Sequence, residues 1–178
     1  MHFALFETAI GACGVAWSTH GLLRMQLPGA DRADTERRLS RHPASMARTA
    51  PPEVARAIAS LQAYMAGQAT DFGAVRVDLR TVDPISQQVY AAARGIEWGR
   101  TLSYGELARR AGMAGAAREV GQALARNPVA IIIPCHRILA SGDRLGGFSA
   151  FGGPEVKRRL LALEGVRPGV PQGQSVLF

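Results

Sequence analysis

Alternating apolar and polar residues mark the first part of the chain and predict short β-strands. A polar segment from Asp31 to Ser40 predicts a short exposed helix. Apolar residues at helical spacing from Glu53 to Ala66, behind Pro51 and Pro52, predict a second helix. The predicted strands are Phe3 to Glu7, Gly14 to Ser18, Leu22 to Leu27 and Phe72 to Leu79. This pattern predicts a small α/β unit.

From residue 83 the pattern becomes mainly helical. Asp83 and Pro84 are typical of a helix start, and Ser103 with Glu106 three residues later is the pattern of a capping box. The continuous apolar run from Val129 to Ile133 predicts a buried strand. The predicted helices are Asp83 to about Glu97, Ser103 to Ala111, Ala116 to Arg126 and Glu155 to Glu164. We therefore predict domains at 1–82 and 83–165 and a loosely ordered tail at 166–178.

The composition fits a globular protein, because 47% of the 178 residues are hydrophobic and 20% are charged. Two cysteines are too few for a disulfide scaffold or a zinc finger. The first residues lack the features of a secretory signal, and no apolar run is long enough to span a bilayer. We therefore expect a soluble, cytoplasmic protein with no membrane partner.

The charge is strongly basic, with 21 lysine and arginine residues against 14 acidic ones and a formal net charge of +7. All of these basic residues except Lys157 are arginines. Such a charge favours a polyanionic partner through phosphate contacts. A genome that prefers arginine codons would produce the same bias, and composition alone does not separate the two explanations.

Cys135 is the candidate nucleophile, since it lies between a buried apolar run and the basic pair His136 and Arg137. Such neighbours lower the pKa of a thiol and favour the reactive thiolate. Adjacent side chains do not easily face each other, so a water molecule would have to connect the cysteine with the histidine. The alternative is a buried structural cysteine, which is the commonest fate of a free thiol.

The predicted helices at 103–111 and 116–126 form a helix-turn-helix pattern, which many ordinary folds also contain. Arg118 projects from the first turn of the second helix. The side of this helix that we expect to be exposed carries small residues, which allow close approach to a groove: Ala114, Gly115, Ala117, Gly121 and Ala125. The alternative is an alanine-rich packing helix with a solvated arginine.

The segment Asn127-Pro128-Val129 followed by Ile133-Pro134-Cys135-His136-Arg137 resembles the signature of the O6-alkylguanine-DNA alkyltransferase family. The resemblance extends to residues 100–108, 116–121 and 157–165 and is strong over about 82–165. Before residue 82 the chain resembles the family only in its general arrangement of elements. The resemblance implies an α/β, ribonuclease-H-like N-terminal domain and a mainly α C-terminal domain with a winged-helix-like helix-turn-helix.

The same resemblance implies a protein that repairs DNA once per molecule. Cys135 would accept the alkyl group from guanine O6 by in-line displacement and stay alkylated. His136 would take the thiol proton through a water molecule, and Glu164 would orient His136 and stabilise its charged form. Asn127 is similar to a hinge asparagine that holds the recognition helix against the active-site segment.

The implied partner is double-stranded DNA carrying O6-alkylguanine, bound through its minor groove, with no obligate protein partner and a monomer in solution. Arg118 would fill the space left by the flipped nucleotide. Tyr104 would crowd the 3′ phosphate and offer its hydroxyl to guanine N3. The residues implied at the DNA are Ser103, Tyr104, Ala117, Arg118, Gly121, Gln122 and Arg137.

The base pocket implied by the resemblance is formed by Ile138, Phe148, Ser149 and Ala150. The carbonyls of Cys135 and Ile138 would accept the guanine amino group, and Ser149 would donate toward O6. Phe148 stands where many members carry tyrosine, and Ala150 stands where some carry glycine, so we expect a narrower pocket with one hydroxyl fewer, which would disfavour bulky alkyl groups.

No cofactor and no metal are expected, since Cys13 with scattered histidines is a poor zinc set. Two other functions remain. A recognition protein would flip the base and transfer nothing, but its relatives lack the cysteine that this chain has. A thiol hydrolase using Cys135 and His136 would turn over repeatedly and would leave Arg118 and Tyr104 unexplained.

Overall fold

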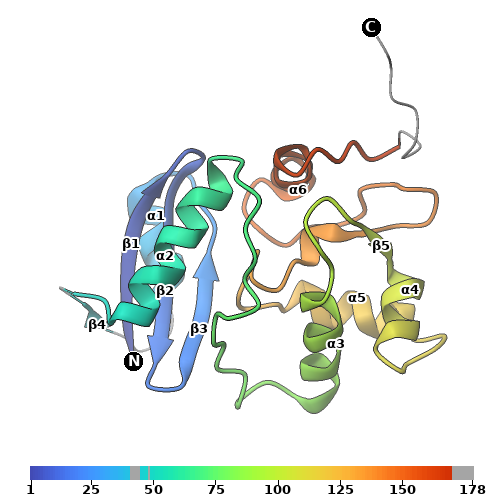
Figure 1. Cartoon of the computed structure of the whole chain (residues 1–178), viewed down its shortest axis with the longest axis horizontal. Helices are drawn as coiled ribbons and strands as arrows, with labels where there is room; N and C mark the ends of the chain where they lie inside the picture. The colour runs from blue at the N-terminus through green and yellow to red at the C-terminus, as the bar shows by residue number, and fades with distance from the viewer. Residues whose placement is uncertain (41–44, 48, 170–178) are drawn as a thin grey trace, which may run out of the picture.

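A four-stranded sheet forms the first part of the chain (Figure 1). The structure is a computed structural model and describes residues 1–40, 45–47 and 49–169. The strands, in the order in which they lie side by side, are β3 (Gly21–Gln26), β2 (Gly11–Ser18), β1 (His2–Thr8) and β4 (Ser45–Met46). β1, β2 and β3 pair antiparallel, whereas β4 runs parallel to β1. The three strands predicted at the start of the chain are confirmed.

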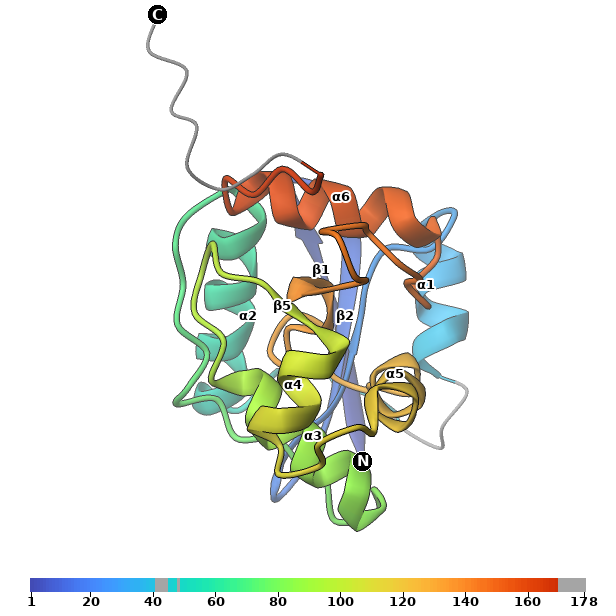
Figure 2. The same cartoon turned by 90° about the vertical axis from the view of Figure 1, so that its right-hand side faces the viewer.

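Helices cover both faces of this sheet, with α1 (Arg32–Leu39) on one side and α2 (Pro52–Met65) on the other (Figure 2). The alternation of side chains along the strands explains this layering. Phe3 packs with Leu39 of α1, whereas Val15 belongs to the cluster that contains Leu61 of α2. β2 is therefore buried on both faces.

The second part is built from four helices and two very short strands. Its elements are α3 (Pro84–Arg94), β5 (Leu102–Ser103), α4 (Tyr104–Arg110), α5 (Ala117–Ala125), the 3-10 turn η1 (Cys135–Arg137), β6 (Ile138–Leu139) and α6 (Gly153–Leu163). Asp83 caps α3, and Ser103 with Glu106 forms the predicted capping box of α4. The predicted helix pair α4 and α5 is therefore confirmed, and α3 ends at Arg94, three residues before the predicted end at Glu97.

The strand predicted from Phe72 to Leu79 is wrong, since only Val77 makes an isolated bridge, to Leu22 of β3. The cause is a side-chain donor that occupies the backbone oxygens which a neighbouring strand would otherwise bind. The guanidinium of Arg94 binds the backbone oxygens of Phe72, Gly73 and Val75. These carbonyls point at a side chain and not at a neighbouring strand.

The strand predicted from Val129 to Ile133 is also wrong, although the segment is buried as expected. Ile131 has a φ angle of 72°, which interrupts an extended backbone and is rare for a β-branched residue. The side chain of Asn127 accepts a hydrogen bond from the backbone nitrogen of Val129 and donates one to the backbone oxygen of Ile133. The segment is therefore a buried loop held by a side chain.

One hydrophobic core extends across the predicted domain boundary near residue 82. Leu61 and Tyr64 of α2 belong to the same cluster as Val89 of α3 and Leu160 of α6. Val166, predicted to begin a loose tail, is 5% exposed and packs with other buried residues. Residues 170–178 of that tail lie outside the described part of the chain. Within the described part, every helix is too short or too polar to cross a membrane.

Replacing Leu61 with alanine tests this shared core. Leu61 is fully buried, so the cavity should lower the free energy of unfolding by about 3 kcal/mol. Urea denaturation measures the change. Arg56→Ala on the exposed side of the same helix is the control and should change stability by no more than about 0.5 kcal/mol. Equal effects of the two substitutions would contradict a core that includes α2.

Candidate active site

Cys135 lies where the buried loop ends and the turn η1 begins, and it is partly exposed. Two pockets meet at this residue, with volumes of about 230 and 270 Å³. Phe148 and Ser149 line both pockets beside the cysteine, and Ala150 lines the smaller one. Three of the predicted pocket residues are thus brought to Cys135. Ile138 is buried and lines neither pocket.

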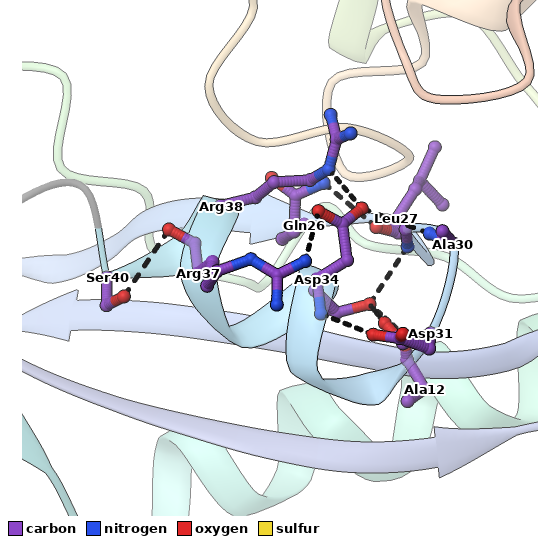
Figure 3. A network of polar contacts seen from close by, with 11 residues as sticks. Ala12, Gln26, Leu27, Ala30, Asp31, Asp34, Arg37, Arg38 and Ser40 are labelled. Atoms are coloured by element: carbon purple, nitrogen blue, oxygen red, sulfur yellow. Dashed lines mark hydrogen bonds and ion pairs between the residues drawn. The ribbon is translucent and has the colours of Figure 1, made fainter.

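The N-terminal part also contributes to the smaller pocket. Arg38 of α1 is one of its lining residues, and the guanidinium lies 5.0 Å from the ring centroid of Phe151. Asp34 holds Arg38 in place, with 2.6 Å between the carboxylate and Nε (Figure 3). Thr35 ties the helix to β2 by donating to the backbone oxygen of Ala12. The pocket beside Cys135 is therefore built by both parts of the chain.

The carboxylate of Glu164 is the centre of a buried network behind the cysteine. Its Oε1 atom lies 2.7 Å from Nε2 of His136 and 2.6 Å from the hydroxyl of Tyr64. The guanidinium of Arg137 donates through Nε, 2.9 Å from Oε2, and through Nη2, 3.0 Å from Oε1. The backbone nitrogen of Gly99 donates to Oε2 from 3.1 Å. The predicted pairing of His136 with Glu164 is present in the structure.

Hydrogen-bond donors around Glu164 keep its carboxylate ionised. Burial alone would raise the pKa of Glu164, but hydrogen bonds from His136, Arg137 and Tyr64 outweigh it and lower the pKa to about 2. Burial in turn lowers the pKa of His136 against the opposing pull of Glu164. At neutral pH the site therefore holds a carboxylate and a neutral imidazole.

The hydrogen-bond network also assigns the tautomer of His136. Since Nε2 faces the carboxylate, this nitrogen carries the hydrogen, and Nδ1 carries the free lone pair. Nδ1 is buried and has no partner among the described protein atoms. The imidazole is thus arranged to accept a proton at Nδ1 and to be stabilised from the opposite side when it becomes charged.

The expectation that basic neighbours lower the pKa of Cys135 is wrong. Burial raises the pKa of this thiol and outweighs the opposing effects of Asn127 and Lys157. The side chains of the two basic neighbours do not lower this pKa, because His136 is neutral and the charge of Arg137 is paired with Glu164. Cys135 therefore rests as a thiol and needs a base at the moment of reaction.

The expectation that Arg137 contacts DNA is also corrected. Its side chain is buried, and besides Glu164 its guanidinium binds the backbone oxygen of Ile96. A guanidinium held in this way is not free to reach a phosphate. Arg137 instead fixes the carboxylate that orients the histidine.

Asn127 and Tyr104 approach the cysteine from the helix pair. Asn127 follows the end of α5, and its two bonds to the buried loop join that helix to the segment before Cys135. Tyr104 begins α4 and lines the larger pocket together with Gly121. A Cβ atom at Gly121 would lie 3.6 Å from the Tyr104 ring, so α5 packs directly against it.

Of the remaining residues predicted to contact DNA, some are exposed, whereas others already have hydrogen-bond partners within the protein. Arg118 and Gln122 are exposed on α5, and Ala117 is partly exposed at its first position. The hydroxyl of Ser103 accepts a hydrogen bond from the backbone nitrogen of Glu106 in the capping box. Each carbonyl expected to accept the guanine amino group already accepts one hydrogen bond: Cys135 from the backbone nitrogen of Ile138, and Ile138 from Lys157.

Sequence reasoning missed two buried residues at this site. Tyr64 falls on the apolar stripe of a helix and is indistinguishable there from a core residue. Lys157 is buried beside Cys135, and burial lowers its pKa to about 8. Lys157 is the single lysine in the sequence, and this was the feature that could have pointed to a special role for it. In the described ranges, no group of three or more histidine, cysteine, aspartate or glutamate residues is placed to hold a metal ion.

Comparisons with known proteins show which family this chain resembles. The family model for the 6-O-methylguanine DNA methyltransferase DNA-binding domain matches residues 84–166. The Mycobacterium tuberculosis H37Rv methylated-DNA–protein-cysteine methyltransferase is 47% identical over 108 residues, which is 61% of this chain and 63% of that protein. The Methanosarcina acetivorans protein of the same name is 34% identical over 176 residues, 93% of this chain and 99% of that protein.

Among solved structures, the M. tuberculosis OGT in complex with DNA matches with a TM-score of 0.75 and 36% identity, covering 92% of both chains. A match at this identity across almost the whole of both chains, together with the archaeal relative, settles the class of protein. The chain belongs to the methylated-DNA–protein-cysteine methyltransferase family.

Replacing Arg137 with leucine leaves the buried carboxylate without its cationic partner, so the free energy of unfolding at neutral pH should fall by about 3 kcal/mol or more. Because the pKa of Glu164 is depressed on folding, its stabilising effect is present above its ordinary value of 4.5 and is lost as the pH falls toward 2. The difference between variant and wild type should therefore shrink over that range, as measured by urea denaturation at several pH values.

The matched control is Arg158→Leu, which removes an exposed arginine paired with Glu155 on α6. An exposed pair contributes little, so this change should cost less than about 1 kcal/mol. If Arg137→Leu were as mild as this control, the buried network would not have the importance assigned to it.

Proposed function

We propose that this protein repairs DNA by direct reversal, accepting the alkyl group of O6-alkylguanine in double-stranded DNA onto Cys135. The observation that carries the proposal is the arrangement behind the thiol. A partly exposed cysteine is followed directly by a neutral buried histidine, which is oriented by the ionised Glu164. This is a site for activating one thiol beside a pocket.

The chemistry is an in-line displacement. The bond from Cys135 Sγ to the alkyl carbon forms as the bond from that carbon to guanine O6 breaks. The thiol proton passes through a water molecule to Nδ1 of His136, and Glu164 stabilises the resulting imidazolium. Tyr104 donates its hydroxyl proton to N3 of the departing guanine and recovers one from His136 through solvent.

The reaction is irreversible and occurs once per molecule. Its product is a thioether, from which a thiolate is not readily displaced, so the reaction leaves no route back to the free thiol of Cys135. The raised pKa of Cys135 supports the need for His136, because a thiol that rests protonated must lose its proton during the displacement. No cofactor enters the reaction, and O4-alkylthymine offers the same type of alkyl–oxygen bond.

We propose that DNA binds along α5 and that this helix enters the minor groove of the duplex. This helix exposes Arg118 and Gln122 beside small side chains, and the whole chain has a net charge of +7. Arg118 would occupy the gap in the stack while the damaged base turns into the pocket at Cys135. The related M. tuberculosis structure in complex with DNA supports the partner. A single copy supplies every group in this scheme, so we propose a monomer in solution.

We further propose that the two parts correspond to a ribonuclease-H-like domain and a winged-helix-like domain. The first proposal is supported by the mixed sheet in the order β3-β2-β1-β4 with its two covering helices. The second is supported by the helix pair α4 and α5 beside the short parallel pair β5 and β6. This division would place the chemistry in the second domain.

Intact-protein mass spectrometry after incubation with a duplex containing one O6-methylguanine tests the transfer. We expect a single gain equal to one methylene group, mapped to Cys135 and absent in Cys135→Ala. Cys13→Ala is the control, because burial raises the pKa of Cys13 to about 11 and makes it unreactive. Tight binding to the lesion without a mass change would instead show a recognition protein, and repeated turnover would show a hydrolase.

Arg118→Ala tests the role of the exposed arginine. Base flipping costs a few kcal/mol, so we expect transfer from the duplex to slow by about tenfold or more. Transfer from the free base O6-methylguanine needs no flipping and should keep its rate. Arg56→Ala, which removes the same charge from α2, should leave both rates unchanged. Equal slowing on the duplex and on the free base would show that Arg118 acts on the chemistry and not on flipping.

A further inference from the structure

Tyr64 brings a side chain from the first part of the chain into the relay. It lies near the end of α2, is fully buried, and is outside the segment matched by the family model. Its hydroxyl oxygen is 2.6 Å from Oε1 of Glu164 and 3.0 Å from Nε2 of His136. The proposed alkyl transfer assigns no role to Tyr64.

The geometry and charges fix the direction of its hydrogen bond. Burial raises the pKa of Tyr64 far above its ordinary value, and the negative charge of Glu164 adds to this effect, so the phenol keeps its proton. Glu164 is ionised and can only accept, whereas Nε2 of His136 already directs its own hydrogen at the same carboxylate oxygen. Tyr64 and His136 are therefore two donors to one oxygen.

We propose that Tyr64 is a positioning residue for alkyl transfer: it fixes the Glu164 carboxylate and limits how strongly His136 holds a proton. The inference rests on the proposed function, in which His136 is the base. A carboxylate oxygen that already accepts a hydrogen bond from Tyr64 attracts the imidazolium less strongly. His136 then stays neutral, and able to take the thiol proton, at a lower pH than it otherwise would.

The surroundings hold the phenol in this position. The ring of Tyr64 packs edge-on against Trp98, with 5.3 Å between centroids, and against His136 at 6.1 Å. Phe72 contacts it from another side at 5.8 Å. A phenylalanine at this position would keep all three ring contacts and lose only the hydroxyl.

Besides Glu164, the groups around His136 are the positively charged Arg137 and Lys157 and the neutral thiol of Cys135. Burial has the largest effect and lowers the pKa of His136, Glu164 raises it, and the positive charges of Arg137 and Lys157 lower it further. Tyr64→Phe leaves each of these groups in place. A change in the titration of His136 in that variant is therefore attributable to the lost hydroxyl.

The test compares Tyr64→Phe with Tyr90→Phe, which removes the buried hydroxyl that donates to the backbone oxygen of Ala123, away from Glu164. The His136 imidazole is titrated by NMR in DNA-free protein, and the pH dependence of single-turnover transfer is recorded separately. In Tyr64→Phe we expect both the titration midpoint and the acidic limb of the transfer rate to rise by about one pH unit. Neither should move in Tyr90→Phe.

An unchanged or lower midpoint in Tyr64→Phe protein with a wild-type near-UV circular dichroism spectrum overturns the proposal. So does an equal shift in Tyr90→Phe. If the wild type transfers no alkyl group but the midpoint rises only in Tyr64→Phe, the proposed function fails while the control of His136 by Tyr64 stands.

A second measurement avoids dependence on the folding of Tyr64→Phe. Biosynthetic replacement of the three tyrosines by 3-fluorotyrosine preserves their shape and makes the phenol a stronger donor. The midpoint of His136 should then fall, in the wild-type background and in Tyr90→Phe alike. A midpoint that stays constant or rises on fluorination overturns the proposal.

Discussion

A single buried carboxylate organises the active-site region. Glu164 sits at the end of α6 and accepts hydrogen bonds from α2, from η1 and from the backbone nitrogen of Gly99. A buried negative charge is tolerated only when donors surround it, so the chain segments that supply those donors must come together. The position and tautomer of His136 follow from this arrangement.

A second constraint places the thiol relative to that network. The buried loop before Cys135 has no sheet partner along most of its length, and Asn127 supplies the hydrogen bonds that a strand neighbour would have provided. Because the same asparagine follows α5, its two hydrogen bonds connect the end of that helix with the segment before Cys135. In the proposed complex, this connection would relate the position of the DNA on α5 to that of Cys135.

Much of this molecule was predictable from local pattern. Alternation gave the first three strands, and the Ser103–Glu106 capping box marked the start of α4. The failures share a physical cause: a side chain took over backbone hydrogen bonds, as Arg94 did at residues 72–75 and Asn127 did at 129–133. Such contacts depend on distant parts of the chain, which no local periodicity reveals.

The site shows the same division. Cys135, His136 and Glu164 were predicted from a family resemblance, whereas the burial of Arg137 and the contact between Tyr64 and Glu164 depend on packing between α2 and the second part of the chain. The raised pKa of the thiol was missed for the same reason, since adjacent charges suggest a low value and only the fold shows that burial outweighs them.

The protonated state of Cys135 has a consequence for the proposed reaction, in which each molecule reacts once. An exposed thiolate would be consumed by any electrophile or oxidant that it met. Burial keeps the sulfur as a thiol, and in the proposed reaction the neutral His136 removes the proton only as the displacement proceeds. In this proposal, only the alkylated base brings both an alkyl group and a leaving group to the pocket beside His136. The same burial that makes the thiol a weak nucleophile at rest would thus preserve it for the single reaction proposed for it.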